Sequence, residues 1–307
     1  FNLCPNQLEE KLIIAKKNNR LPKIIVAVHL CGQSADMDKI NEIAKKNNLL
    51  VISDAAQSPG ALYKGKLAGT VGDIGGFSFN YHKHIHTGEG GMIVTNNNEF
   101  AKKAQLIRNH AEAAIVSEKN PDLVNMLGHN FRLGEIESAI GICQLNKLNK
   151  AMQSRQKIAK VLNSYLDSID GIQVPVVRNQ CTHVYYFYAM KVSPDKLGIS
   201  RDLLHKALVA EGVPYLSNNY QNLHLLPMFQ EKICYGAGGF PWHYSNVTSN
   251  IDYSKGICPV AEQLNDHEYL GLFLCGSNYN ETEIHSIINA FDKVFSNLDH
   301  LRNYDMS

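Results

Sequence analysis

The sequence predicts an α/β fold built on a mostly parallel sheet, followed by a smaller α+β domain. In the first half, short apolar runs alternate with segments of helical spacing, which is the pattern of parallel strands joined by helical crossovers. From about Arg155 this alternation stops, and helices, one alternating segment and a long irregular stretch follow. A chain of 307 residues is long enough for two cores. We therefore predict a first domain over residues 1–154 and a second over residues 155–307.

The elements of the first half follow from local patterns. Continuous apolar runs such as Ile24–His29 predict strands that are buried on both faces. Apolar residues at helical spacing predict helices, and Asp36 is a candidate N-cap for one of them. The predicted strands cover residues 24–29, 49–53, 73–80 and 91–95, and the predicted helices cover residues 8–17, 36–46, 99–110 and 133–148.

The second half mixes helices with short strands. Helices are predicted over residues 155–166, 201–211 and 281–297, and strands over residues 171–175 and 184–190. The irregular stretch Tyr215–Pro259 contains the only tryptophan, Trp242. Its length predicts a loop that sets substrate choice or forms an oligomer, and simple packing of the domain edge is the alternative.

Composition and charge exclude several classes of protein. Lys and Arg number 30 against 29 Asp and Glu, a formal charge of +1, so we predict no nucleic-acid partner and no anionic membrane partner. No apolar run approaches the roughly 20 residues that span a bilayer. The start Phe1–Pro5 lacks the pattern of a signal peptide. Because the chain begins with Phe and in mid-pattern, we expect a fragment or a processed product.

The cysteines and histidines give little support for a metal site. Seven cysteines are scattered singly, which favours reduced thiols in a cytoplasmic protein. His82, His84 and His86 alternate, and on an extended segment they would share one face that zinc could use. No cysteine or carboxylate pair with ligand spacing accompanies them. We therefore expect no metal and assign these histidines to solvent or substrate.

Lys83 is the most informative residue of the chain. It follows an apolar strand, stands five positions after Ser78 and precedes a glycine-rich turn. An amine in that place suits a Schiff base with a cofactor aldehyde, and a surface lysine is the alternative. Asp54 ends another apolar strand, where its carboxylate can pair with a protonated pyridine nitrogen or simply cap a turn. Gln57 offers an amide for a phenolic oxygen, and Ser78 offers a hydroxyl for a phosphate. Because the carboxyl ends of parallel strands meet at one edge, these groups can converge.

Several ordered motifs carry a resemblance to a known family. They are His29-Leu-Cys-Gly-Gln-Ser-Ala-Asp-Met-Asp38, Asp54-Ala-Ala-Gln-Ser-Pro-Gly-Ala61, the lysine segment from Gly72 to Gly91, and the segment from Asn130 to Leu145. Together they resemble the DegT/DnrJ/EryC1/StrS family of pyridoxal-phosphate-dependent sugar aminotransferases. The resemblance is strong over about residues 1–165 and loose over the remainder. It implies a three-layer large domain of fold type I, the aspartate-aminotransferase fold, and a smaller C-terminal domain.

The resemblance also implies an activity and a role for each candidate residue. The activity is transfer of an amino group from an amino acid, glutamate by expectation, to a keto-sugar nucleotide or keto-cyclitol in surface-polysaccharide or amino-sugar biosynthesis. Lys83 would bind the aldehyde of pyridoxal phosphate and move protons, and Asp54 would pair with the ring nitrogen. Gln57 would bond near the phenolic oxygen, and Ser78 would bind the phosphate. Asn130 would reach the phosphate in the partner subunit of a homodimer, with a helix cap as the local alternative.

Three points remain open at this stage. His29 either lines the cofactor pocket or is a core histidine at a strand end. Relatives that remove a hydroxyl carry histidine at the lysine position; here the spacing places Lys83 there, which favours transamination over a 3-dehydratase. The family also has a further N-terminal part, the size of a small domain, with a phosphate loop and an aromatic that stacks on the cofactor. A truncated, non-catalytic paralogue that keeps the dimer surface is therefore a second alternative.

Overall fold

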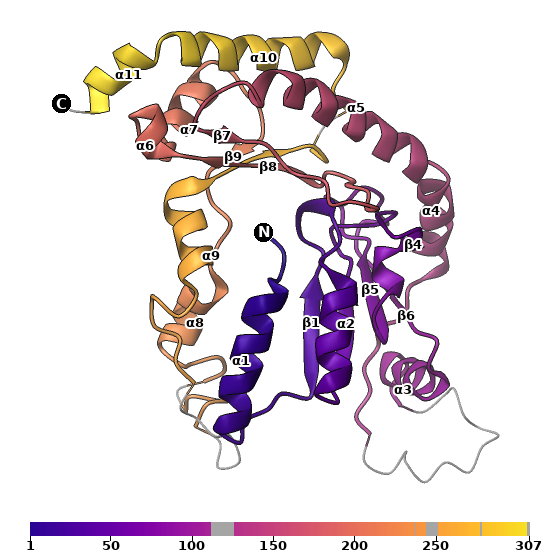
Figure 1. Ribbon diagram of the computed structural model, residues 1–307. Helices are drawn as coiled ribbons and strands as arrows, with labels where there is room; N and C mark the ends of the chain where they lie inside the picture. Colours follow the sequence, from indigo (N-terminus) through magenta and orange to yellow (C-terminus); the bar gives the residue numbers. More distant parts are fainter. Residues whose placement is uncertain (112–125, 237, 244–250, 277, 306–307) are drawn as a thin grey trace. The chain divides into compact units, whose positions relative to one another are not determined.

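The computed structural model describes residues 1–111, 126–236, 238–243, 251–276 and 278–305. The chain divides into two compact units (Figure 1). Unit 1 comprises Phe1–Lys160, Val176–Phe187 and Leu274–Asn278, and unit 2 comprises Val161–Pro175, Tyr188–Phe273 and Tyr279–Ser307. The predicted domain division at residue 155 stays a prediction.

Unit 1 is built on a four-stranded sheet whose order is β1-β2-β5-β6. The strands are β1 (Ile24–Val28), β2 (Leu50–Asp54), β5 (Ile74–Ser78) and β6 (Gly91–Val94). The first three run parallel, and β6 pairs with β5 in the antiparallel sense. The mostly parallel sheet predicted from the sequence is therefore confirmed. A small hairpin of β3 (Leu62–Tyr63) and β4 (Lys66–Leu67) lies outside this sheet.

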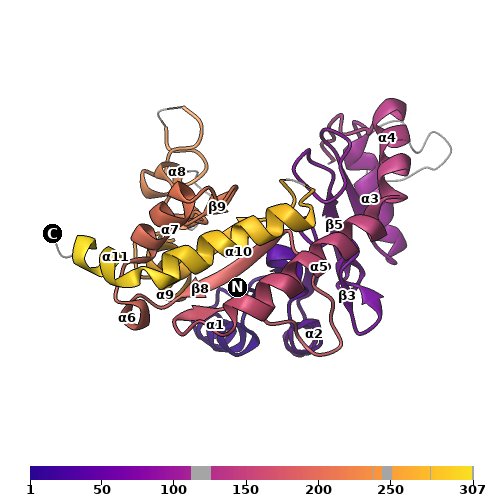
Figure 2. The same ribbon diagram turned by 90° about the horizontal axis from the view of Figure 1, so that it is seen from above.

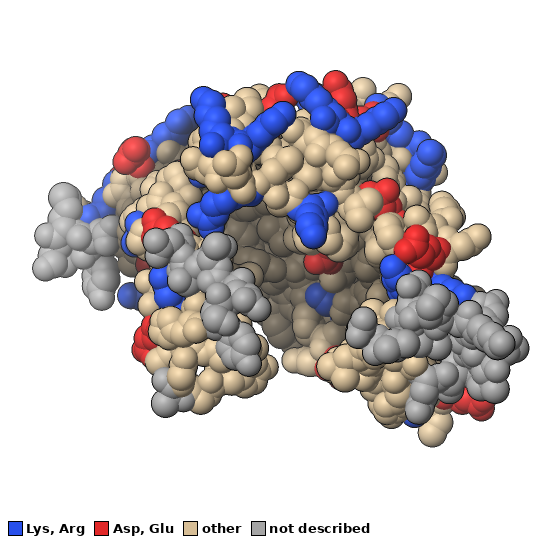
Figure 3. Space-filling model, turned by 90° about the horizontal axis from the view of Figure 1, so that it is seen from below, with Lys and Arg blue, Asp and Glu red and all other residues tan. Residues whose placement is uncertain are grey.

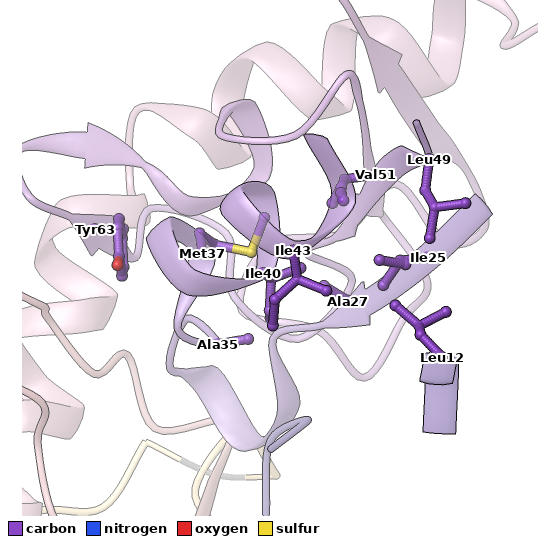
Figure 4. Packing of buried hydrophobic residues seen from close by; sticks show 11 residues of the cluster. Leu12, Ile25, Ala27, Ala35, Met37, Ile40, Ile43, Leu49, Val51 and Tyr63 are labelled. Carbon is purple, nitrogen blue, oxygen red and sulfur yellow. The ribbon is translucent and has the colours of Figure 1, made fainter. Parts of the chain in front are cut away.

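Helices α1 (Pro5–Lys17) and α2 (Met37–Lys46) pack on one face of the sheet, as Figure 4 shows. The apolar residues of α2 recur at helical spacing, so its buried side chains meet the inward residues of β1 and β2. Ile25, Ala27, Ile40 and Val51 belong to this core. Burying each large aliphatic side chain contributes about 1.5–3 kcal/mol to the free energy of unfolding. This core fixes the carboxyl ends of the strands, where the candidate residues lie.

The other face of the sheet differs from expectation. Residues Ile24 to Val28 alternate exposed and buried, and Val26 is 53% exposed. On β6, Met92 and Ile93 are both exposed. The predicted burial of β1 on both faces is wrong for the described residues, because these residues cover only the face that packs against α1 and α2. An apolar run shows that a strand is suited to burial but not which part of a protein covers it.

The remaining helices of the first half also differ in one place. Helix α3 spans Asn98–Arg108, and the side chain of Asn97 caps it by accepting from the backbone N–H groups of Glu99 and Phe100. The helix predicted over residues 133–148 is confirmed as α4 (Glu135–Leu145), which is two residues shorter at its start and three at its end. After a turn at residues 146–147 comes α5 (Leu148–Leu166), so the helix predicted from residue 155 begins earlier than expected.

Unit 2 contains a second sheet of order β7-β8-β10-β9. Its strands are β7 (Ile172–Gln173), β8 (Phe187–Val192), β9 (Leu216–Ser217) and β10 (Tyr269–Phe273). Helices α7 (Arg201–Ala210) and α10 (Glu281–Ser296) lie side by side (Figure 2). Helix α10 begins with a capping box of Asn280 and Glu283. Shorter helical segments are α6 (Pro194–Leu197), η4 (Leu223–Leu225), α8 (Pro227–Gln230), α9 (Pro259–Gln263), η5 (Leu264–Glu268) and α11 (Leu298–Asp305).

A buried carboxylate fixes the end of the irregular stretch predicted over residues 215–259. Glu262 accepts hydrogen bonds from the backbone N–H groups of Gly256 and Cys258 and contacts His224 Nε2 at 2.9 Å. Burial alone would raise the pKa of Glu262, but these hydrogen bonds lower it below its usual range. Residues 237 and 244–250 of the predicted loop lie outside the described residues.

The surface carries both signs of charge. Lys and Arg side chains occur together with Asp and Glu on the face shown in Figure 3, in keeping with the formal charge of +1. Within the described ranges, no helix is both long enough and apolar enough to cross a bilayer.

Candidate functional site

Lys83 lies in the loop that joins β5 to its antiparallel neighbour β6. Strand pairing closes the loop at its base, where Ser78 stands opposite Gly91. Inside the loop, Phe79 N–H donates to Gly90 O at 2.8 Å, and Lys83 N–H donates to Asn80 O at 3.0 Å. The loop backbone is therefore held at its base and again beside the lysine.

The Lys83 amine is half-buried and surrounded by groups from distant parts of the chain. Its Nζ lies 4.6 Å from the centroid of the Tyr186 ring. Burial lowers the pKa of the Lys83 amine, while Asp54 and Cys275 act in the opposite direction. A lowered pKa increases the fraction of free amine at neutral pH, and the free amine is the form that attacks a carbonyl.

Asp54 is the last residue of β2 and faces the same region. In the sheet it stands between Val28 of β1 and Gly76 of β5. Its Oδ1 accepts from the Ala56 N–H at 3.0 Å, which fixes one carboxylate oxygen. A Cβ atom built on Gly76 would meet no atom within 4 Å. The space beside Gly76, the sheet neighbour of Asp54, is therefore open.

Gln57 follows the end of β2, and Ser78 is the last residue of β5. Gln57 is 9% exposed, and its Oε1 accepts from the Cys31 N–H at 2.8 Å, so the orientation of its amide is set. Ser78 ends β5, and its Oγ accepts from the Asn80 N–H at 3.3 Å. The structure therefore brings Asp54, Gln57, Ser78 and Lys83 to one end of the sheet. Together they offer an amine, a carboxylate, an amide and a hydroxyl, and this donor set fits pyridoxal phosphate.

Asn130 stands apart from these four residues. It is exposed, forms an isolated bridge with Asn109, and its Oδ1 accepts from the Arg132 N–H at 3.4 Å. No contact within the described part of the chain joins it to Lys83. An exposed position is what a residue that reaches another subunit would need.

His29 is a core residue. It is fully buried, its Nδ1 accepts from the Ala35 N–H at 3.1 Å, and its Nε2 lies 3.0 Å from Ala68 O. These partners place the ring proton on Nε2, where it donates to the carbonyl. Burial lowers the pKa of His29, so the ring is neutral at neutral pH.

The neighbouring histidines of the loop bind different groups. His82 Nδ1 lies 2.6 Å from the Tyr186 hydroxyl, and His84 Nε2 lies 2.8 Å from Val184 O. Burial, with a smaller effect of Arg155, lowers the pKa of His84 to about 3. No group of three or more metal-ligating side chains gathers among the residues that the structure describes.

Sequence reasoning missed three residues around the lysine. Tyr186 is 4% exposed and stands against Lys83. Cys275 has a pKa raised to about 11 by burial, so it is a neutral thiol. Arg155 is buried beside it and donates through Nε to Leu274 O at 3.3 Å. The alternating pattern around Tyr186 predicted a strand, but it did not indicate that this residue contacts Lys83.

A mostly parallel sheet with a half-buried lysine near a carboxylate fits the class of fold type I pyridoxal-phosphate enzymes, and solved structures of that class match the chain. The model of the DegT/DnrJ/EryC1/StrS aminotransferase family matches residues 1–256, and the chain belongs to this family. The aminotransferases of this family use pyridoxal phosphate.

Individual relatives agree with this assignment. The chain is 35% identical over 241 residues to GDP-perosamine synthase of Caulobacter vibrioides, covering 75% of this chain and 63% of that protein. It is 38% identical over 195 residues to dTDP-3-amino-3,6-dideoxy-alpha-D-galactopyranose transaminase of Aneurinibacillus thermoaerophilus, covering 62% of this chain and 50% of that protein. The crystal structure of a DegT DnrJ EryC1 StrS aminotransferase from Brucella abortus matches with a TM-score of 0.77 and 27% identity, covering 96% and 70% of the two chains. The chain thus spans 63% of the length of the GDP-perosamine synthase and 50% of the length of the transaminase.

Proposed function

We propose that the protein is a sugar aminotransferase that moves an amino group from an amino acid, glutamate by preference, to a keto-sugar nucleotide or keto-cyclitol. The observation that carries the proposal is the half-buried Lys83 amine of lowered pKa, facing Asp54 in a chain of this family. Two of its relatives are named for making amino sugars on a nucleotide carrier, which supports this substrate class. Pyridoxal phosphate, when bound, supplies an electron sink that stabilises negative charge on the substrate carbon.

Each candidate residue has a separate task in this proposal. Lys83 Nζ would hold the cofactor through its aldehyde and would move a proton to or from the reacting carbon. The Asp54 carboxylate would hold a proton on the pyridine nitrogen, and the Gln57 amide would bond near the phenolic oxygen. The Ser78 hydroxyl would bind the phosphate. The electrostatic effect of Asp54 on Lys83 supports the proximity of the two side chains.

A homodimer is part of the proposal. Helix α4 has no buried residue, and its Ile136 and Ile142 are 77% and 66% exposed. Phe131, one position after Asn130, is also 66% exposed. Apolar side chains of this size favour a partner surface over water. A second copy covering α4 would bring Asn130 of each subunit toward the other, where it binds the phosphate of the partner's cofactor.

The alternative is a non-catalytic protein that keeps the dimer surface without holding the cofactor. Measuring the stoichiometry of bound pyridoxal phosphate on the 307-residue chain separates the two proposals. The cytoplasmic location stays a prediction; all seven cysteines are free thiols.

The test of the proposed function is chemical mapping of the lysine. The chain is loaded with pyridoxal phosphate, reduced with borohydride and digested, and the pyridoxyl group is located by mass spectrometry. We expect the label on Lys83, its loss in Lys83→Ala, and normal labelling in the control Lys66→Ala, an exposed lysine of the same unit. If Lys83→Ala carried as much pyridoxyl label on its other lysines as the unmodified chain carries on Lys83, the assignment would be wrong.

Product analysis separates transamination from dehydration. With glutamate and a keto-sugar nucleotide, transamination releases one 2-oxoglutarate for each amino sugar formed. The 3-dehydratase alternative predicts a deoxygenated sugar without amine transfer.

A further inference from the structure

The side chain packed directly against the Lys83 amine is an aromatic ring. The Tyr186 ring centroid lies 4.6 Å from Nζ, well inside the distance of about 6 Å at which a ring face attracts a cation. Tyr186 is 4% exposed, so water does not screen this contact strongly. The contact favours the ammonium form of the amine over the neutral form.

A hydrogen bond fixes that ring in place. The Tyr186 hydroxyl lies 2.6 Å from His82 Nδ1. Burial, and then the nearby Lys83, lower the pKa of His82, so its imidazole is neutral at neutral pH. The phenol O–H therefore donates to Nδ1, and the ring proton of His82 is on Nε2. Because His82 directly precedes Lys83, the residue that holds the ring belongs to the same loop as the amine.

Charged and titratable groups from several other elements surround Lys83. Asp54 on β2 is a carboxylate that favours the ammonium form, and Cys275 adds a smaller effect in the same direction. His82 and His84 flank the lysine as neutral rings, and Arg155 acts on His84 and Cys275 behind them. A ring face favours the ammonium form without adding an anion that would bind the proton itself.

We propose that Tyr186, held by His82, is a positioning residue for Lys83 whose ring face stabilises the amine while it carries a proton. Proton transfer in both directions needs an amine that is free to attack and still able to accept a proton. Burial favours the free amine, and the ring offsets part of that effect. The proton-carrying role rests on the proposed function, whereas the effect of the ring on the amine does not.

The test changes the electronics of the ring and keeps its shape. Tyr186 is replaced by Phe and then by phenylalanines of increasing fluorine content, which weaken and finally reverse the negative potential of the ring face. The acetylation rate of Lys83 is measured against pH by competitive trace labelling with acetic anhydride, without cofactor, with exposed Lys66 as internal reference. The series is nearly isosteric, so folding is preserved and is checked by circular dichroism.

We expect the pKa of Lys83 to fall stepwise with fluorination. The fraction of free amine at neutral pH should rise about three- to tenfold between Phe and the fully fluorinated ring, the range that a cation–ring contact supports. Tyr185→Phe, a change in the buried neighbour that stacks on His183, is the control and should leave Lys83 unaltered. An unchanged titration of Lys83 across the series would overturn the inference.

The outcome is separable from that of the proposed function. A graded titration in a chain that transfers no amino group would refute the proposed function and leave the ring effect standing. If pyridoxal phosphate labels Lys83 but the titration of Lys83 is the same in all the ring variants, the ring effect is refuted and the proposed function stands.

Discussion

Substituting alanine for Gly75 should disrupt the sheet that carries the site, whereas the same change at Gly76 should not. Gly75 lies in β5 beside Ser53 of β2. A Cβ built on Gly75 would lie 1.6 Å from the carbonyl oxygen of Gly69 and 2.9 Å from Val94 Cγ2. On Gly76, the next residue of the strand, it would meet nothing within 4 Å. The two substitutions therefore share chemistry and secondary structure and differ only in available space.

The size of the effect follows from what has to move. The Gly69 oxygen belongs to the backbone, and real Cβ contacts stay above 3.0 Å, so β5 or the turn at η2 (Ala68–Thr70) must shift. Overpacking costs about 1–3 kcal/mol and occasionally more. Because a backbone group cannot rotate away as a side chain can, we expect about 3 kcal/mol for Gly75→Ala. Gly76→Ala should stay within about 0.5 kcal/mol.

Hydrogen exchange is the suitable assay because the chain has two units and a single unfolding curve would average them. Peptides covering β2 and β5 should exchange faster in Gly75→Ala and at the native rate in Gly76→Ala. Exchange of the same peptides measured at rising urea concentration gives the matching free energies for this part of unit 1. Equal protection in the two variants would refute the reasoning from the close approach of Gly69.

Three further predictions concern other parts of the molecule. Burial lowers the pKa of Lys83, so below the ordinary lysine pKa the residue should keep more of its high-pH rate of acetylation by acetic anhydride than a free lysine side chain does. A smaller retained fraction would contradict this. The pKa of Glu262 is lowered, so its stabilisation is complete above the ordinary carboxyl pKa and is lost as pH falls through the lowered value. In Glu262→Gln, the free energy of unfolding of unit 2 should therefore fall less steeply as the pH is lowered. Unfolding is followed by Trp242 fluorescence, and an unchanged pH dependence would contradict the prediction. Ile136→Asp should turn the proposed dimer into a monomer in sedimentation velocity, and a persistent dimer would remove α4 from the interface.

Local pattern was enough to predict most of the sheet and its order along the chain. The apolar runs that became β1, β2, β5 and β6 end at polar or glycine residues, so their limits were found within about two residues. Lys83 and Asp54 could be singled out because each follows such a run, where a parallel sheet gathers its functional groups. Their placement at one end of the sheet was therefore predictable from topology alone.

The missed features depend on contacts that local pattern does not record. The exposed face of β1 could not be predicted, because an apolar residue such as Val26 can occur in a strand whether or not another part of a protein covers it. The start of α5 at Leu148 was also missed, since the predicted helix began only at residue 155. Tyr186 meets Lys83 from a different strand region, and one sequence contains no information on which of its tyrosines does so.

The contact between His82 and Tyr186 has a consequence for the order in which the protein is made. These residues are 104 positions apart, while the hairpin loop that carries the lysine closes over a short stretch of chain between Ser78 and Gly91. Short loops close with little loss of entropy, and long ones must wait for distant segments to arrive. The lysine loop can therefore form while Tyr186 is still unsynthesised, with its amine exposed to water and carrying the proton of an ordinary lysine. The amine reaches its final surroundings only after Tyr186 has been synthesised and has packed against it. The lowered pKa of Lys83 is therefore a property of the finished fold.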